Sequence, residues 1–383
     1  MTSTWRFGMP IRLRPDLAAL PPYAPGTMPP VAINLAGNEV RAELPDSVLK
    51  AIGDAATRSG RYPDPTASAL VARLAERLDV ATRNVVVGCG SVTLCHQAVQ
   101  ATCAAGEEVL FPWVSFEAYP VIARIVGATP RPVPLAEDWS PDLPALLAAI
   151  GPATRVVFLC APNNPTGAQP GADALRDFLA AVPPSVLVII DEAYREFAVG
   201  PDVPDGVALA RELWRQGRDN VAVLRTFSKA HGLAGLRLGY LVGAETVTAA
   251  LGRVQVPFGA STVAQAAALA SLDAEDEVVE RCRTIVRERD RVRRLLVDAG
   301  YQVPPSHGNF LWLPIGARSA RFAAHCRDHG IAVRAFGADG VRMTIGTTAE
   351  NDAFVAAARM TYGEQPVGTA GRTSRRDQHG DVG

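Results

Sequence analysis

The fold class of this chain is decided by residues 225–240, which read "RTFSKAHGLAGLRLGY". The stretch contains Lys229, and among the 38 lysine and arginine side chains of the sequence the only other lysine is Lys50. A lysine amine can lose its proton and form a Schiff base with a carbonyl group, whereas an arginine side chain stays protonated. Lys229 follows the apolar run "VAVLRTF", and open α/β sheets bind their ligands where such strands end. Lys229 is therefore the first candidate for a catalytic side chain, whereas Lys50 fits the solvent face of a helix.

Length and composition indicate a globular protein that acts on small molecules. The 383 residues are 48% hydrophobic, which suffices for one large domain and a smaller one. The 38 basic and 39 acidic side chains give a net charge of -1, so neither a nucleic acid nor an anionic membrane is expected as a partner. No apolar run approaches roughly 18 residues and the start lacks a signal-peptide core, so we expect a cytoplasmic protein. The six cysteines form no C-x-x-C pair and are expected to be reduced.

Alternating helix and strand patterns predict an α/β fold. From about residue 46, stretches with helical periodicity, such as "SALVARLAERL", alternate with short apolar runs. These runs, each bounded by turn residues, are "NVVVG", "EVLFP", "TPRPVPL", "RVVFLCA", "VLVIIDE" and "NVAVLRTF". The alternation is typical of a mainly parallel sheet between helices.

The same pattern divides the chain into four expected parts. Residues 1–45 are expected to form an N-terminal arm and the start of a small domain. Residues 46–289 are expected to form a large domain that includes a charged connecting helix. Residues 290–362 are expected to form the small C-terminal domain, with "GNFLWLPI" and "VRMTIGT" as strands. The polar, Gly-rich tail, residues 363–383, is expected to be disordered.

Two loops that follow predicted strands can position ligand-binding groups. The first, "GCGSV", joins a strand to a helical stretch, so the amides of Ser91 and Val92 lie at a helix N-terminus where a phosphate can bind. A tight strand-to-helix turn is the alternative interpretation of these glycines. The second loop, "APNNPTG", is stiffened by two prolines and can aim the amide side chain of Asn164.

Asp191 comes directly after five apolar residues in "VLVIIDEAYREF". A carboxylate buried there is costly unless it meets a positive partner, and a protonated ring nitrogen would be such a partner. The alternative interpretation is an aspartate that caps a helix N-terminus.

Taken together, "GCGSV", "APNNPTG", "IIDEAY" and "RTFSKAHGLAGLRLGY" resemble the motifs of fold type I pyridoxal-phosphate aminotransferases. Within that group the chain is similar to the histidinol-phosphate aminotransferase branch, and most similar to actinobacterial aromatic (phenylalanine) aminotransferases. The resemblance runs from "RPDLAALPPYAPG" to about residue 360. It implies a large domain with a mainly parallel sheet between helices, a smaller C-terminal α/β domain, and pyridoxal 5'-phosphate as cofactor.

The resemblance assigns roles around the cofactor. Lys229 would carry the cofactor on its amine and then shuttle a proton, and Asp191 would keep the ring nitrogen protonated. Tyr194 would bond the ring hydroxyl with support from Asn164, and Phe116 would stack on the ring. The groups that would hold the phosphate are Ser91, Val92, Thr226, Ser228 and Arg237.

The resemblance also assigns roles at the subunit boundary and the substrate mouth. Tyr62 would reach the phosphate of a neighbouring subunit, which implies a homodimer with shared active sites. Arg342 would clamp the substrate carboxylate, with Arg334 nearby. Tyr23 and Asn38 would line the mouth.

Two departures from the family pattern bear on the substrate. His231 stands where relatives have tyrosine or phenylalanine, and we interpret it as a packing substitution rather than an altered substrate contact. The segment after Glu39 lacks the usual asparagine and proline. A metal site formed by His325, Cys326 and His329 is a weaker alternative interpretation, because it lacks a third ligand of equal quality.

The leading functional hypothesis is a ping-pong aminotransferase that moves the amino group of an aromatic L-amino acid to 2-oxoglutarate. Aromatic side chains suited to the pocket are Trp113, Phe116, Phe258 and Tyr23. Histidinol-phosphate transamination is the nearest rival, because Arg334 and Arg342 can equally hold a phosphate. A lyase or decarboxylase of the same fold is a further alternative, since these enzymes differ in which Cα bond they align for cleavage.

Overall fold

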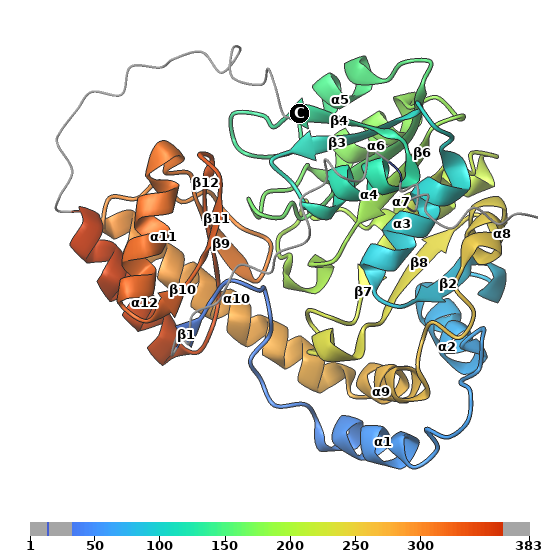
Figure 1. Ribbon diagram of the computed structural model, residues 1–383, viewed down its shortest axis with the longest axis horizontal. Coiled ribbons are helices and arrows are strands. Elements are labelled where there is room, and N and C mark those ends of the chain that lie inside the picture. The colour runs from blue at the N-terminus through green and yellow to red at the C-terminus, as the bar shows by residue number, and fades with distance from the viewer. Residues whose placement is uncertain (1–13, 15–32, 363–383) are drawn as a thin grey trace, which may run out of the picture. The chain divides into compact units, whose positions relative to one another are not determined.

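The computed structural model describes residue 14 and residues 33–362, and Figure 1 shows the helices and strands. The described residues from 33 onward belong to one compact unit. None of the helices in this part of the chain is long and apolar enough to cross a membrane.

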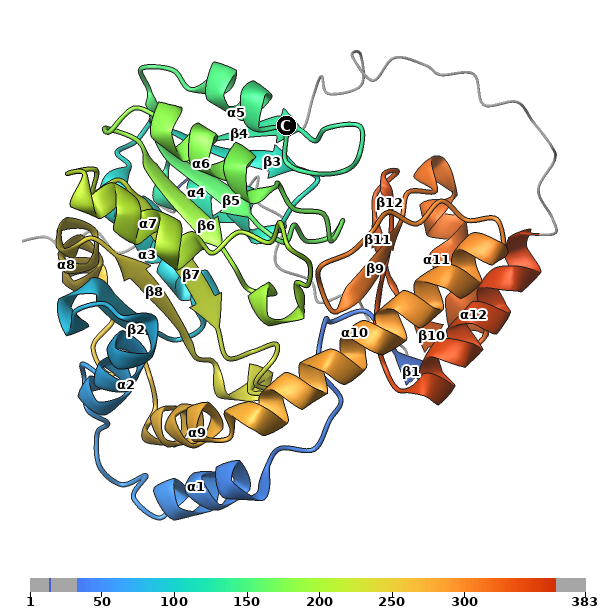
Figure 2. The same ribbon diagram turned by 180° about the vertical axis from the view of Figure 1, so that it is seen from behind.

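A seven-stranded sheet forms the core of the larger part of this unit (Figures 1 and 2). Its strands, in spatial order, are β2 (Val85–Gly88), β8 (Gly239–Gly243), β7 (Val221–Thr226), β6 (Leu187–Asp191), β5 (Thr154–Cys160), β3 (Glu108–Trp113) and β4 (Thr129–Pro134). The pairs from β7 to β4 are all parallel, and only β8 runs antiparallel to its two neighbours. The prediction of a mainly parallel sheet is confirmed, and β8 is the strand that it missed.

Helices cover both faces of this sheet because its central strands are apolar on both sides. Along β5, Val157 and Leu159 pack into one core, whereas Phe158 and Cys160 pack into the other. The first core receives α1 (Asp46–Ala56), α2 (Ser68–Leu78), α5 (Leu143–Ala149), α6 (Ala172–Ala181), α7 (Gly206–Arg215) and α9 (Thr262–Asp273). The second receives α3 (Ser91–Thr102), α4 (Ala118–Val126) and α8 (Glu245–Val254). The result is a three-layer α/β arrangement.

A second, smaller sheet is antiparallel. It consists of β11 (Arg334–Phe336), β12 (Gly340–Thr344) and β9 (Phe310–Leu313), and it packs against α10 (Glu275–Asp298), α11 (Ser319–Asp328) and α12 (Thr348–Tyr362). A two-stranded ladder joins β1 (Ile33–Asn34) to β10 (Ile331–Ala332). Short 3-10 helices complete the structure: η2 (Thr82–Asn84), η3 (Arg195–Phe197), η4 (Ala234–Leu236) and η5 (Gly316–Arg318).

Strand alternation gives the small sheet two different faces. Leu311 and Met343 point into the core formed with the helices. Phe310, Trp312 and Arg342 alternate with them and point to the opposite face. That face therefore carries the residues available to a binding site.

The two sheets with separate cores suit the expected large and small domains. The expected limit at residue 289 falls inside α10, a single helix of 24 residues, so the domain limits stay a prediction. Tyr23, the first part of the expected N-terminal arm and the tail at residues 363–383 lie outside the described residues. Lys50 pairs with Asp54 on α1 and its side chain is 78% exposed, which confirms the interpretation of a solvated helix face.

We expect two glycine substitutions to change stability in opposite directions. A methyl group at Gly340 would lie 2.5 Å from the Leu313 carbonyl oxygen of the neighbouring strand, so Gly340→Ala should destabilise the fold by about 1–3 kcal/mol. Gly252 lies within α8 on its exposed side, with open space around it. Gly252→Ala should therefore stabilise the fold by about 0.5–1 kcal/mol. Urea unfolding midpoints measure both effects, and a shift in the same direction for both variants would contradict this packing.

Candidate active site

Most of the candidate site residues gather at the carboxyl ends of the central parallel strands. Asp191 is the last residue of β6 and pairs in register with Cys160 at the end of β5 and Leu224 near the end of β7. Lys229 lies in the turn after β7, and Asn164 lies in the loop after β5. Because parallel strands end at one edge of the sheet, groups distant in sequence meet there.

The Lys229 amine lies in a partly buried position between the two sheets. Its Nζ donates to the carbonyl oxygen of Asn38 at 3.1 Å and lies 5.8 Å from the centroid of the Tyr194 ring. The pKa of this amine is lowered to about 8, mainly by burial and also by the Arg342 guanidinium, whereas Glu39 opposes the shift. An amine of this kind loses its proton at mildly alkaline pH and then acts as a nucleophile.

Asp191 is a carboxylate removed from water. It is 3% exposed, and its Oδ2 accepts a hydrogen bond from the Tyr119 hydroxyl at 2.7 Å. The Ala193 amide donates to Oδ1 at 3.2 Å. Burial raises the pKa of Asp191 to about 6, although both hydrogen bonds act in the opposite direction. Since both donors are neutral, this carboxylate would be stabilised further by a cationic group.

Asn38 joins segments from both ends of the described chain. Its Nδ2 donates to the Tyr194 hydroxyl at 2.9 Å, and its Oδ1 accepts from the Thr344 hydroxyl at 3.0 Å. Asn309 donates to its carbonyl oxygen at 3.2 Å. Asn38 has a φ of +52°, a conformation that asparagine tolerates better than most residues. These contacts hold the Tyr194 hydroxyl beside Lys229, and burial raises the pKa of Tyr194 above its usual range.

An anion-binding corner forms where α3 begins. Gly90 precedes the helix with a φ of +77°, and a methyl group there would lie 2.6 Å from Nη2 of Arg237. A methyl group at Gly239 would lie 2.6 Å from the Ser91 amide nitrogen. Only glycine therefore permits this close approach between the helix start and the turn after β7.

The groups in this corner suit a phosphate. The first amides of α3, Ser91 and Val92, have no partner within the helix and lie at its positive end. Arg237 lies 3.4 Å from the Ser228 hydroxyl, and the Thr226 hydroxyl accepts from the Ser228 amide at 3.1 Å. The corner thus brings together all five side chains and amides that the sequence predicted for a phosphate.

Arg342 is a buried guanidinium fixed by polar and aromatic groups. It donates to Oδ1 of Asn164 and to the Ala36 carbonyl oxygen, both at 2.5 Å. Its centre lies 5.7 Å from the Phe310 ring and 5.4 Å from the Phe336 ring. Burial lowers its pKa to about 10, and Nε has no hydrogen-bond partner among the described residues. This Nε is a donor that an anionic ligand can satisfy.

Arg334 is the cross-strand neighbour of Arg342 on β11. Its Nη2 lies 2.9 Å and 3.0 Å from the two carboxylate oxygens of Glu117. Glu117 follows Phe116, whose ring packs edge-on against Tyr119 with centroids 5.4 Å apart. Arg334 therefore faces the site as one member of an ion pair. Sequence reasoning missed both Glu117 and Tyr119.

Tyr62 lies apart from the cluster. Its side chain is 84% exposed and stacks on Phe258 with ring centroids 4.8 Å apart. The structure brings neither residue into contact with Lys229 or Arg342, so Phe258 does not line the site within this chain. An exposed tyrosine at this position remains available to another protein surface.

The residues singled out as departures or alternatives form bonds within the described chain. Nδ1 of His231 forms a hydrogen bond with the hydroxyl of Ser271 on α9 at 2.7 Å, and the His231 ring packs on Phe227. Both contacts are expected for a packing substitution. His325 and His329 each bond a backbone carbonyl. Among residues 33–362 no group of three or more histidine, cysteine or acidic side chains is placed to hold a metal ion, and all six cysteines are free thiols.

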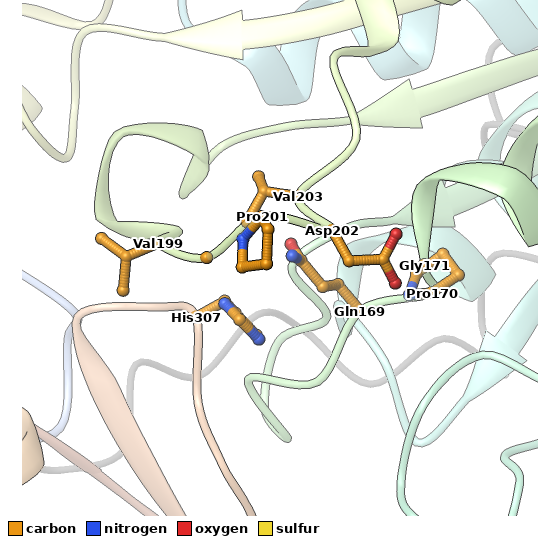
Figure 3. Close-up of a pocket in the computed structure, with 9 residues that line it drawn as sticks. Gln169, Pro170, Gly171, Val199, Pro201, Asp202, Val203 and His307 are labelled. Atoms are coloured by element: carbon orange, nitrogen blue, oxygen red, sulfur yellow. The ribbon is translucent and has the colours of Figure 1, made fainter.

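A separate cavity of about 290 Å³ contains none of the predicted site residues (Figure 3). Its lining residues are Gln169, Pro170, Gly171, Val199, Gly200, Pro201, Asp202, Val203 and His307. Asp202 already accepts from the Ala172 amide at 2.9 Å, and the His307 amide donates to the Gly167 carbonyl oxygen at 2.7 Å. These contacts attach the cavity walls to α6 and to the loop that carries Asn164.

The chain is similar to known aminotransferases over most of its length. The sequence family "Aminotransferase class I and II" matches residues 30–357. An aromatic amino acid aminotransferase of Mycobacteroides abscessus is 52% identical over 347 residues, which cover 91% of this chain and 98% of that protein. A protein of the same name from Nocardia farcinica is 50% identical, covering 91% of this chain and 96% of that protein.

Solved structures give the same family. A histidinol-phosphate aminotransferase from Sinorhizobium meliloti, in complex with pyridoxal-5'-phosphate, superposes with a TM-score of 0.83 and 30% identity. It covers 92% of this chain and 98% of its own. A Thermus thermophilus aspartate aminotransferase variant, at a TM-score of 0.78 and 22% identity, covers 92% of this chain and 99% of its own and supports the fold. The fold type I assignment is thereby confirmed.

Asp191 predicts a pH-dependent effect on stability. The pKa of Asp191 rises from 3.8 to about 6 on folding, so between these pH values the folded state retains a proton that the unfolded state has released. The stability of the fold therefore decreases as the pH rises through this range. The stability of Asp191→Asn relative to the unaltered protein should therefore increase by on the order of 2 kcal/mol from pH 4 to pH 7. Urea unfolding of the cofactor-free protein measures this difference.

The matched control is Asp54→Asn, which removes an exposed carboxylate from α1. A stability difference for Asp191→Asn that is equal at both pH values would show that Asp191 is not destabilised by its burial.

Proposed function

This chain belongs to the class I and II aminotransferases, and we propose that it moves the amino group of an aromatic L-amino acid to 2-oxoglutarate by a ping-pong mechanism. The observation that carries the proposal is a cluster of three charged side chains. A lysine amine of lowered pKa and a buried carboxylate lie at the carboxyl ends of the central strands, and β12 adds a buried arginine. The names of relatives at about 50% identity support the aromatic substrate.

The described residues fit pyridoxal 5'-phosphate as the cofactor. The corner at α3 offers helix amides, hydroxyls and Arg237 for a phosphate, and Gly90 leaves the space that a side chain would fill. Asp191 offers a buried carboxylate for a protonated ring nitrogen. When bound, the cofactor supplies the electron sink that makes removal of the Cα proton possible.

The side chains around this position act on protons and orientation. The Lys229 amine would hold the cofactor and would accept and return the proton at Cα. Asp191 would hold the proton on the ring nitrogen, and the Tyr119 hydroxyl fixes the orientation of that carboxylate. Tyr194 and Asn164 would bond the ring hydroxyl, and the Phe116 ring would lie against the cofactor ring. Arg342, with its unpaired Nε, would bind the substrate carboxylate.

Aromatic side chains support the proposed substrate class. The face of the small sheet that carries Arg342 also carries Trp312 and Phe336, whose ring centroids lie 5.8 Å apart. Trp139 packs edge-on against Trp312 at 5.9 Å. These apolar groups exclude water around the guanidinium, which strengthens its interaction with a carboxylate. Trp113 and Phe116 would complete an apolar pocket, together with Tyr23 outside the described residues.

Histidinol-phosphate transamination is the second candidate function. It is supported by the name of the Sinorhizobium meliloti structure and by the cross-strand pair of Arg334 and Arg342, two cations that can together bind a phosphate.

In protein loaded with pyridoxal 5'-phosphate (PLP), we expect the cofactor to convert to its amine form faster with L-phenylalanine than with histidinol phosphate. Loss of the absorbance band of the lysine-bound cofactor follows the half-reaction. Faster conversion with histidinol phosphate would favour the second candidate function. If neither substrate converts the cofactor to its amine form, transamination is contradicted.

Lys229→Ala should abolish both covalent attachment of the cofactor and turnover, because Lys229 supplies the only amine at the site among the described residues. With the unaltered protein, attachment should increase with pH around pH 8, the pKa of the buried amine, rather than around 10.5. Lys50→Ala is the matched control, since Lys50 is exposed on α1. Full activity of Lys229→Ala would remove the basis of the site assignment.

The proposed homodimer with shared sites makes Tyr62 testable by mixing. Tyr62→Phe removes the hydroxyl that would reach the partner's phosphate and should weaken cofactor binding about tenfold. When Tyr62→Phe and Lys229→Ala chains are mixed equally and reassociated, half of the dimers contain one intact site. Activity at low cofactor concentration should then reach about a quarter of the unaltered level. Activity equal to the mean of the two parents would mean that Tyr62 serves its own subunit or none.

A further inference from the structure

Two arginines and one glutamate form a charge group beside the substrate end of the site. Arg334 and Arg342 are opposite each other on β11 and β12. Directly opposite residues of an antiparallel pair share a face and have Cβ atoms about 5 Å apart. Like charges in that position repel, so the pair is costly unless an anion lies close by.

Glu117 supplies that anion from the other sheet. It follows β3 and immediately precedes α4, so the backbone of the large sheet sets its position. Both of its oxygens lie within 3.0 Å of one nitrogen of Arg334. The side chains of Arg334 and Glu117 are 35% and 48% exposed, so the pair borders the opening of the site rather than its interior.

Glu117 also acts on Arg342 without touching it. Burial is the main cause that lowers the pKa of Arg342, and Arg334 lowers it further. Tyr194 and Glu117 act in the opposite direction. Glu117 thus cancels the repulsion from Arg334, and the three side chains together present a net charge of one positive unit.

We propose that Glu117 is a specificity-determining residue that selects a carboxylate over a phosphate monoester at this end of the substrate. The inference rests on the proposed function. A substrate carboxylate carries one negative charge, which matches Arg342 alone. A phosphate monoester carries about 1.5 to 2 negative charges at pH 7 and three acceptor oxygens, so it needs the second arginine as well. Glu117 withholds that second arginine and adds repulsion against the dianion.

The test is Glu117→Gln, which keeps the shape of the side chain and removes its charge. The half-reactions of PLP-loaded protein with L-phenylalanine and histidinol phosphate give kcat/KM for each. We expect the ratio of kcat/KM for histidinol phosphate to that for phenylalanine to rise about threefold to fivefold, the scale of one partly exposed charge interaction. Adding Arg334→Gln should return the ratio to its original value, because the gain requires a released Arg334.

The matched control is Glu245→Gln at the start of α8, which breaks an exposed ion pair with Arg83 of η2. This variant changes the net charge equally and should leave the ratio as it was. A rise in both variants would mean a general charge effect and would overturn the proposal. Equal losses with both substrates in Glu117→Gln would show that the pair only holds the two sheets together, and would overturn it too.

A binding measurement separates failure of this inference from failure of the proposed function. Calorimetric titration of PLP-loaded protein with inorganic phosphate needs no turnover. Tighter phosphate binding to Glu117→Gln than to the unaltered protein, reversed by Arg334→Gln, supports the role of Glu117 even if phenylalanine proves not to be a substrate. Unchanged phosphate binding together with an unchanged kinetic ratio overturns the inference while the aminotransferase assignment stands.

Discussion

The structure depends on one carboxylate that the protein has placed out of reach of water. Asp191 ends the central strand β6 and is held by the neutral donors Tyr119 and Ala193. Burial alone favours its protonated form, so the fold bears a cost that a cation on the ligand can offset. In the proposed function this is the carboxylate for the ring nitrogen of the cofactor, and Lys229 lies in the turn after the neighbouring strand. Local stability is thereby given up for affinity.

The second requirement is that the two sheets meet at the loop that carries Asn164. The large sheet supplies Asp191, Asn164 and the turn with Lys229, whereas the small sheet supplies Arg342. Side chains on β12 alternate, so a single strand can present Arg342 to the site and Met343 to the helices. The bond from Arg342 to Asn164 joins the two sheets directly. The guanidinium that we propose for substrate binding is therefore also the one that joins the two sheets.

Much of this arrangement could be predicted from the sequence, because it depends on local patterns. The strand before Asp191, the turn with Lys229 and the glycines before α3 are all visible in short segments. Tyr119 and Glu117 could not be found in that way. Their partners lie 72 and 217 residues away, and nothing local distinguishes a tyrosine that bonds a carboxylate from one that fills a core. β8 was missed because its glycines and its antiparallel direction depart from the alternating pattern.

The region around the small sheet is assembled from both ends of the described chain. β1 pairs with β10, Leu35 receives a hydrogen bond from the Thr344 amide, and Asn38 bonds the Thr344 hydroxyl. During synthesis on the ribosome, the large sheet is complete once β8 has emerged, about a hundred residues before β12 follows. Until then the segment with Asn38 has no strand to join. The nascent chain can therefore complete its main sheet early, but Lys229 meets Asn38 and Arg342 only after β12 has emerged.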